Sequence, residues 1–253
     1  TAPRGDVLVV VFLRGAADVL NMVVPHGEDE YYKLRPALGI PRPDDNKAKA
    51  EERTIDLDGF FGFHPILAPL LPIWQEGHLG IIHACGAHDD SHSHFKAQEL
   101  MERGVENEHG PASGWIGRHL ATLNTNNASP MRAIALGEMP QRSLYGSVPV
   151  SALRSLEDFK LRGDELAVAQ MQAALGSLYS GNDSLSHLGR ETMSILDTLE
   201  KITPRSPNSQ SPNYPESNFG RGLREIGSII KAEVGLEVAA IDLDGWDTHF
   251  AQG

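Results

Sequence analysis

Residues 7–18 read VLVVVFLRGAAD, an unbroken apolar run followed by a glycine-containing turn and an aspartate. A run rich in valine without polar interruptions is typical of a strand buried on both faces of a parallel sheet. The pattern predicts a strand over residues 7–13. The turn at 14–17 then places Asp18 just beyond the carboxyl end of that strand.

Working outward from this strand, apolar runs and helical periodicity alternate along the chain. Three more runs predict strands, at 79–85, 131–136 and 237–243. Helical spacing or start and stop signals predict helices at 64–76, 93–103, 115–123 and 219–234. Strands that alternate with helices indicate an α/β fold with a mostly parallel central sheet flanked by helices. In such sheets, ligands gather outside the carboxyl ends of the strands.

The 253 residues are interpreted as a single domain with one insertion and one long loop. Residues 155–202 are rich in alanine and leucine, which predicts a mostly helical insertion broken near 181–182. Residues 203–217 hold prolines among serine and asparagine and are predicted to be a surface loop. The charged stretch 44–53 is expected to be a solvated loop or a short helix.

Bulk composition argues against nucleic acid as a partner, against a membrane span and against a disulfide. The chain has 22 Lys and Arg against 34 Asp and Glu, a formal charge of −12, which would repel a nucleic-acid backbone. Its apolar runs are far shorter than the roughly 20 residues that cross a bilayer, so no membrane span is expected. Cys85 is the only cysteine, which excludes an intrachain disulfide.

Asp18 is the first residue whose position suggests chemistry. A carboxylate held at the end of a strand can coordinate a cation, because its oxygens suit hard or borderline metals. An aspartate in a turn can equally be the N-cap of a following helix. Both interpretations stay open from this residue alone.

A second group of polar residues occupies 83–94, where the sequence HACGAHDDSHSH packs histidine and aspartate densely. A metal site and a solvated polar loop are both compatible with this composition. Ser93 is more specific, since a hydroxyl at a helix N-terminus faces unpaired amides and the positive end of the helix dipole. Serine is also a preferred N-cap, although Lys96 stands where a capping box would have Glu or Gln.

The third group is DLDGWDTH, residues 242–249, at the end of the last predicted strand. Asp247 and His249 are two residues apart, and carboxylate with imidazole is a common zinc pairing. Trp246 and Trp115 are expected to pack in the core or in a pocket wall.

A nucleophilic serine needs a base or a metal ion to stabilise its alkoxide. The sequence holds no Gly-x-Ser-x-Gly elbow, which disfavours an α/β-hydrolase triad. A metal ion held by carboxylates from separate strands is the better activator. The three groups would then converge on one pocket at one edge of the sheet.

Six segments in this order resemble the bacterial domain-of-unknown-function family 1501. They are FLRGAADVLNMVVPH (12–26), YYKLRP (31–36), GFHPIL (62–67), the predicted strand IIHACG (81–86) followed by SHSHFKAQELMERG (91–104), GWIGRHL (114–120) and GWDTH (245–249). That family is grouped with the alkaline phosphatase/sulfatase superfamily, whose members hydrolyse or transfer phosphate and sulfate esters with one or two metal ions. The resemblance implies an alkaline phosphatase-like fold.

Carried over residue by residue, the resemblance implies metal ligands at Asp18, Asp247 and His249 and a nucleophile at Ser93. The cofactor would be one or two divalent ions, with zinc, calcium, magnesium and manganese not distinguished. His92 stands where the family usually has arginine. The candidates for substrate binding are His92, His94 and Arg118, although Arg118 could equally be a helix arginine at the surface.

The family continues beyond the Asp-Thr-His motif with further ligand motifs, whereas this chain stops at Gly253. The resemblance therefore implies a chain that lacks its C-terminal portion, through truncation, cleavage or a separate polypeptide. Family members often carry export signals. Together with the Thr1-Ala2-Pro3 start, this favours a periplasmic or extracellular location with the signal removed.

The leading hypothesis is a metal-dependent hydrolase acting on a small anionic phosphate or sulfate ester. The alternative is an exported, catalytically silent metal-binding or assembly domain of the same fold, because fold membership alone does not confer activity. A histidine-rich metal-binding protein that uses only residues 83–94 is a third hypothesis.

Overall fold

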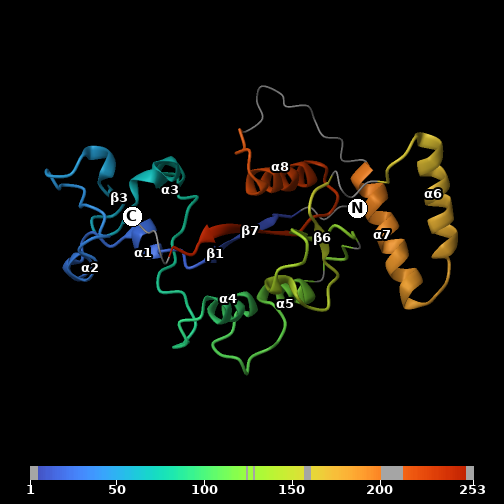
Figure 1. Cartoon of the computed structure of the whole chain (residues 1–253), viewed down its shortest axis with the longest axis horizontal. Helices are drawn as coiled ribbons and strands as arrows, with labels where there is room; N and C mark the ends of the chain where they lie inside the picture. Colours follow the sequence, from blue (N-terminus) through green and yellow to red (C-terminus); the bar gives the residue numbers. More distant parts are fainter. Residues whose placement is uncertain (1–4, 124, 128, 157–160, 201–212, 249–253) are drawn as a thin grey trace. The chain divides into compact units, whose positions relative to one another are not determined.

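The computed structural model describes residues 5–123, 125–127, 129–156, 161–200 and 213–248 (Figure 1). The chain divides into two compact units, and each is described by itself. The first unit comprises Thr1–Phe12 and Ala87–Leu243, and the second comprises Leu13–Gly86 and Asp244–Gly253. Among the helices of the described residues, none combines the length and the apolar character needed to span a bilayer.

A four-stranded sheet forms the centre of the first unit, in the order β1-β7-β5-β6. Its strands are β1 (Leu8–Gly15), β7 (Val238–Trp246), β5 (Ala133–Leu136) and β6 (Ser151–Leu153). β5 pairs in parallel with both β6 and β7. Strands β1 and β7 end in residues that belong to the second unit. The predicted α/β class with a mostly parallel sheet is thereby confirmed.

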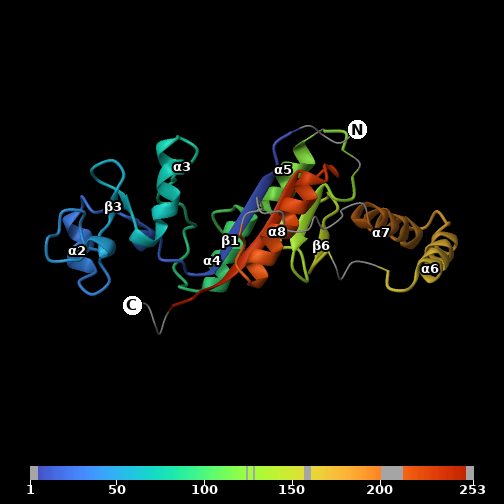
Figure 2. The same ribbon diagram turned by 90° about the horizontal axis from the view of Figure 1, so that it is seen from above.

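Alternating residues of the central strands bury against helices on opposite faces of the sheet. Ile134, Leu136 and Ile241 face a core that includes α7 (Ser184–Glu200) and α8 (Asn218–Lys231). Ala133, Ala135 and Ala240 face a second core that includes α5 (Trp115–Thr122). Figures 1 and 2 show α8 on one side of the sheet, with α5 and α4 (His94–Arg103) on the other.

The helices predicted at 93–103, 115–123 and 219–234 are confirmed as α4, α5 and α8. In α8, Gly222 allows the close approach that this packing needs, because an added Cβ would lie 2.4 Å from Ile241 Cδ1. The strands predicted at 7–13, 131–136 and 237–243 are confirmed as β1, β5 and β7.

The strand predicted at 79–85 is wrong. The segment has no regular structure, and Ile82 is 83% exposed. Ala84 has a positive φ of 54°, which interrupts any extended conformation. The fourth strand of the sheet is instead β6, a three-residue strand that the sequence analysis missed. A strand this short gives no periodic signal.

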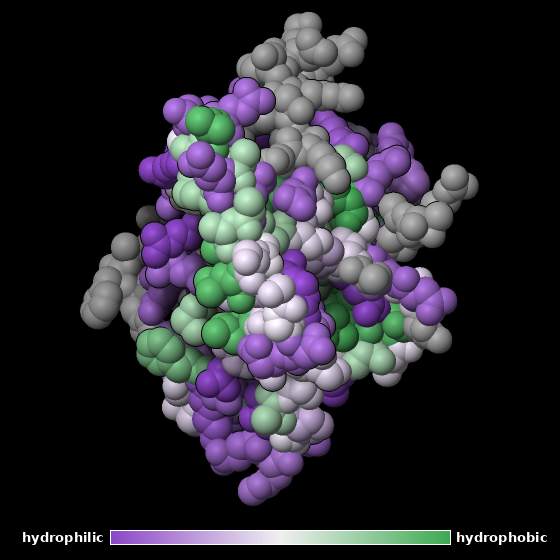
Figure 3. Space-filling view, turned by 90° about the vertical axis from the view of Figure 1, so that its right-hand side faces the viewer, coloured by the Kyte–Doolittle hydropathy of each residue, from purple (hydrophilic) through white to green (hydrophobic). Residues whose placement is uncertain are grey.

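The helical character predicted for 155–202 is confirmed in the described residues, which form a hairpin of α6 (Glu165–Leu178) and α7 with a break at 179–183. No residue of α6 is buried, and Leu166 and Leu178 are among its exposed side chains. Figure 3 views the side on which this hairpin lies in Figure 1, and apolar groups appear there among hydrophilic ones. Of the loop predicted at 203–217, only 213–217 lie within the described residues, and they are irregular.

The second unit contains a small antiparallel sheet, in the order β2-β4-β3. Its strands are β2 (Val23–Val24), β4 (Gly62–Phe63) and β3 (Ile55–Asp56). Around it lie α1 (Val19–Met22), α2 (Asp29–Leu34), the 3₁₀ helices η1 (Ala50–Glu52) and η2 (Pro65–Leu70), and α3 (Leu71–Gln75). The helix predicted at 64–76 is thus split in two, because its prolines remove backbone donors.

A largely buried ion pair fixes the start of β7 in the first unit. Arg132 Nε donates to Glu237 at 2.7 Å, and Thr125 Oγ1 and Asn127 Nδ2 donate to the same carboxylate. Burial raises the pKa of Glu237, but these three donors outweigh it and hold the pKa below the ordinary 4.5. The ionised form therefore stabilises the fold.

We expect Glu237→Gln to lower the free energy of unfolding by about 3 kcal/mol at pH 7, because the largely buried Arg132 loses its charged partner. Since the folded pKa lies below the unfolded one, the contribution of Glu237 is present above the unfolded value. It is lost as the pH falls through the folded value. Urea denaturation from pH 7 to pH 3 should show the two proteins converging at acid pH. A difference that does not change with pH would contradict this account.

Candidate functional site

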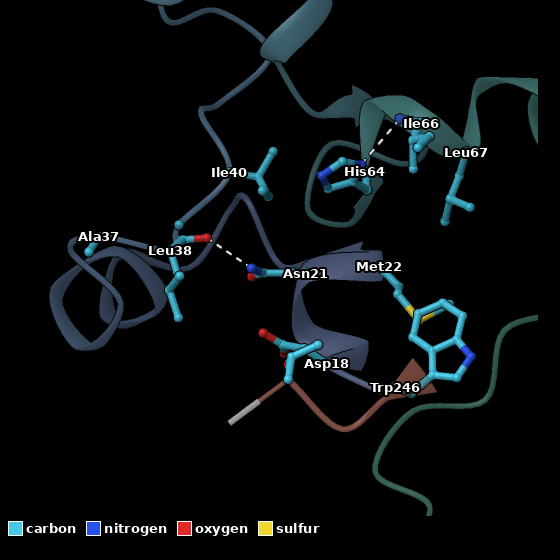
Figure 4. Close-up of a pocket in the computed structure, with 12 residues that line it drawn as sticks. Asp18, Asn21, Met22, Ala37, Leu38, Ile40, His64, Ile66, Leu67 and Trp246 are labelled. Atoms are coloured by element: carbon cyan, nitrogen blue, oxygen red, sulfur yellow. Dashed lines mark hydrogen bonds between the residues drawn. The ribbon is translucent and has the colours of Figure 1, made fainter. Parts of the chain in front are cut away.

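A pocket of about 520 Å³ lies in the second unit (Figure 4). It is lined by Asp18, Asn21, Met22, Ala37, Leu38, Gly39, Ile40, His64, Ile66, Leu67, Trp246 and Thr248. Cavities of this size commonly hold small organic molecules. The lining is mostly apolar, and the polar side chains come from Asp18, Asn21, His64 and Thr248. Trp246 lies in the pocket wall, as predicted.

The predicted metal ligand Asp18 is one of the polar residues of this pocket. It is the N-cap residue of α1, but its side chain makes no capping hydrogen bond. Arg35 Nη1 instead donates to Asp18 Oδ2 at 2.5 Å, and the two side chains are 26% and 16% exposed. The carboxylate is therefore held by a cation from the α2 end of the unit rather than by the helix that it precedes.

Asn21 connects this ion pair to the rest of the pocket wall. Its Oδ1 accepts from the Tyr31 hydroxyl at 2.7 Å and from Arg35 Nη1 at 3.3 Å. Its Nδ2 donates to the carbonyl of Leu38 at 2.9 Å, and the Tyr31 oxygen accepts from the amide of Ile40 at 3.0 Å. The loop at 37–40 is thereby fixed to α1 and α2 through partly buried hydrogen bonds, which gives the pocket a preformed wall.

His64 lies on another side of the pocket, at the start of η2. Its Nδ1 accepts from the amide of Ile66 at 3.2 Å. Burial lowers the pKa of His64 below its ordinary value, so the ring is neutral at pH 7. A neutral ring that accepts at Nδ1 carries its proton at Nε2. His64 therefore offers a hydrogen-bond donor without a charge.

The segments that carry Asp18 and Asp247 leave adjacent parallel strands at the same edge. Leu8 N donates to Glu237 O and Ala16 N donates to Trp246 O, so the bonded residues advance together along β1 and β7. Trp246 and Thr248 line the pocket with Asp18, whereas Asp247 is not among the lining residues. The backbone segments that carry Asp18 and Asp247 therefore leave the sheet at the same edge, as predicted.

Gly15 makes this close approach of the two strand ends achievable. Its φ is 122°, and an added Cβ would lie 2.3 Å from the backbone nitrogen of Asp247. We expect Gly15→Ala to lower the free energy of unfolding by about 3–4 kcal/mol, through backbone strain and a collision with main-chain atoms. Gly59→Ala is the matched control, because Gly59 also has a positive φ but its Cβ would meet no atom within 4 Å. Denaturant unfolding of both variants measures the difference. Equal losses would argue against the collision.

The ligand set predicted for a metal ion is only partly within the described residues. His249 lies outside them, and the described residues contain no group of three or more His, Cys, Asp or Glu side chains placed to hold a metal ion. The oxygen donors of Asp18 and Asp247 fit a hard divalent cation. A carboxylate also has lone pairs enough to accept from a guanidinium and to bind a cation. The donor chemistry fits, and the metal site stays a prediction.

Ser93 belongs to the first unit and is the N-cap of α4. Its backbone is extended, and its hydroxyl oxygen accepts from the amide of Lys96 at 3.4 Å. The preceding loop is folded around it, because the Ser91 hydroxyl donates to Asp89 and accepts from the amide of Ser93. Ser93 therefore lies at a loop-to-helix turn, which corrects the predicted strand-to-helix turn.

The neighbouring histidines differ in conformation. His92 is exposed and has a positive φ of 50°, which costs a non-glycine residue about 1–2 kcal/mol. His94 is the first residue of α4 and is half-buried. Their predicted contacts with a substrate stay predictions.

Arg118, the third candidate for substrate binding, holds a loop of its own unit. Its guanidinium donates to the carbonyls of Ser113 and Arg103, at 2.5 and 2.7 Å. The buried Arg103 donates in turn to three carbonyls between residues 108 and 111. These bonds support a structural role for Arg118, and its predicted anion contact stays a prediction.

The sequence analysis missed the partners of Asp18 and the role of His64. Arg35, Tyr31 and His64 lie inside YYKLRP and GFHPIL, two of the segments that carry the family resemblance. The polar residues of these two segments were the sequence signal that could have identified them as part of the site. The structure places Asp18 and the Asp247 segment together in the second unit, and Ser93 and Arg118 in the first. Convergence of the two groups stays a prediction.

Comparisons of this chain with protein-family models, with curated proteins and with solved structures find no significant match. The resemblance to family 1501 and to the alkaline phosphatase/sulfatase superfamily therefore stays a prediction from the six segments.

Proposed function

We propose that this chain belongs to a metal-dependent hydrolase of phosphate or sulfate esters. In this proposal Asp18, Asp247 and His249 hold one or two divalent ions, and Ser93 is the nucleophile. The observation that carries it is the position of Asp18, which lies in the wall of a ligand-sized pocket at the ends of β1 and β7. This is the edge of a parallel sheet at which ligands gather.

The residues of the chain would have separate roles in this reaction. When bound, the metal ion would polarise the ester oxygens and neutralise developing charge. Asp18 would supply a carboxylate ligand, kept in place by Arg35 and the Asn21 network. Ser93 would attack from the N-terminus of α4, where backbone amides and the helix dipole favour an anion. His92, His94 and Arg118 stay the proposed contacts of the ester's anionic group.

A second candidate is a catalytically silent binding domain, and the pairing of Asp18 with Arg35 favours it. A carboxylate already neutralised by a guanidinium needs no metal ion for stability. The pocket could then bind a ligand without chemistry. This candidate keeps the fold and the pocket but predicts no turnover.

The two candidates separate in one experiment. The purified chain is assayed for bound zinc, manganese, magnesium and calcium, and for hydrolysis of 1-naphthyl phosphate and 1-naphthyl sulfate with each ion and with EDTA. Metal-dependent turnover that EDTA abolishes supports the enzyme. No turnover of either ester, with every ion tested, supports the silent domain and overturns the hydrolase.

A further inference from the structure

The pocket of the second unit is much larger than a metal ion with a phosphate or sulfate group requires. Its volume of about 520 Å³ is that of a site for an organic molecule. Asp18 and the β7 end lie on one side, and His64, Ile66 and Leu67 lie on the other (Figure 4). The space between them is available for a group other than the reacting anion.

Most of the side chains around this space are apolar. The larger apolar ones belong to Met22, Leu38, Ile40, Ile66, Leu67 and Trp246. Each square ångström of apolar ligand surface removed from water there contributes about 25 cal/mol. The Trp246 ring adds a flat wall against which a planar group can stack. The lining therefore favours an apolar, ring-containing group over a sugar, whose hydroxyls would lose their hydrogen bonds to water.

The charges around the pocket balance. Asp18 is paired with Arg35, and His64 is neutral because burial lowers its pKa. In Figure 4 the His64 ring extends from the start of η2 toward Ile40. Since its Nδ1 is bonded to the Ile66 amide, Nε2–H is the ring's donor. Among the described residues that line the pocket, the charged side chain of Asp18 is paired with Arg35, and His64 offers a neutral donor.

We propose that the pocket binds the uncharged, mostly apolar organic group of the ester, with a hydrogen-bond acceptor on that group meeting Nε2–H of His64. The inference rests on the proposed function in taking the bound group to be part of an ester substrate. It makes the substrate class esters of aromatic or other apolar alcohols, as opposed to sugar phosphates or nucleotides.

The test measures binding without turnover. The neutral fluorescent probe N-phenyl-1-naphthylamine is titrated into the full chain in EDTA, and a saturable rise in fluorescence is expected. Ile66→Glu should weaken binding at least about tenfold, because it brings a charge to the apolar lining. Ile82→Glu is the matched control, since Ile82 is also an exposed isoleucine of this unit, 83% against 77%, but does not line the pocket. Equal melting temperatures of the two variants show that both are folded.

The donor is tested with 1-naphthol as a competitor of the probe. His64→Asn retains an acceptor for the Ile66 amide but removes Nε2–H. It should weaken displacement by 1-naphthol about fivefold, the value of one neutral hydrogen bond, while probe affinity stays within about twofold. An unchanged 1-naphthol affinity would remove His64 from the inference.

Two results overturn the inference as a whole. One is the absence of saturable probe binding, and the other is equal binding by the Ile66→Glu and Ile82→Glu variants. Neither depends on catalysis, because no metal ion and no ester are present. If the probe binds as expected but no ester is hydrolysed, the proposed function fails while the pocket assignment stands. Apolar esters would then be replaced by free apolar alcohols as the ligand class.

Discussion

Ser93→Ala is expected to lower metal-dependent ester hydrolysis by about 10³-fold or more, with little change in metal content. Removal of a nucleophile eliminates the covalent route and leaves only the binding and electrostatic contributions. The same change removes the N-cap of α4, which costs about 1 kcal/mol of stability. Activity is measured with 1-naphthyl phosphate at saturating metal, and stability by urea denaturation.

Two further variants separate the nucleophile from the cap. Ser93→Asn preserves an N-cap acceptor but has no hydroxyl, so it should be stable and inactive. Ser217→Ala removes the cap of α8, where Ser217 accepts from the amide of Gly220. It should lose similar stability and keep full activity. An active Ser93→Asn protein would exclude Ser93 as the nucleophile, whatever the alanine variant shows.

The sequence predicted those parts of the fold that repeat a pattern over several turns or residues. Alternation in β5 and β7 buries both faces, and this appears in the sequence as continuous apolar runs. The spacing of Phe219, Leu223, Ile226 and Ile230 predicts α8 for a similar reason. These signals are local, and they survive because tertiary packing requires the same periodicity.

The sequence failed where structure depends on partners distant in the chain. Residues 79–85 have the composition of a strand, yet a strand forms only when a neighbour accepts its hydrogen bonds. The two-residue strands β2, β3 and β4 form through pairing alone and give no pattern. Amino-acid composition cannot distinguish a strand-like segment that finds no pairing partner from a short strand that does.

The candidate site shows the same limit. The end of β1 predicts the place of Asp18, because a strand end is a local feature. Its partner Arg35 lies 17 residues further along the chain, and His64 enters from η2. Turns and the small sheet bring these residues together. The chemistry of the pocket therefore followed from side-chain contacts that no spacing rule predicts.

The pairing of Asp18 with Arg35 leads to the second prediction with a large effect. Metal affinity should change in opposite directions when Asp18 and Arg35 are replaced in separate variants. Asp18→Asn should weaken binding of Mn²⁺ at least about 100-fold, since loss of a direct ligand costs no less than the 10–100-fold loss of an outer partner. Arg35→Met removes a positive charge beside the ion and should make binding tighter. Isothermal titration calorimetry with Mn²⁺ measures both affinities.

The stability of the two variants tests the role of the Asp18 carboxylate independently of the affinity measurement. Each variant removes one charge of the half-buried Asp18–Arg35 pair and should cost about 2 kcal/mol without metal. Mn²⁺ should then raise the melting temperature of Arg35→Met, because the ion replaces the lost cation beside Asp18, but not that of Asp18→Asn. Arg42→Met is the matched control, since Arg42 pairs with the exposed Asp29 and does not line the pocket. If Mn²⁺ stabilises Arg35→Met no more than Arg42→Met, Asp18 serves the ion pair alone, and the silent binding domain becomes the better account of this fold.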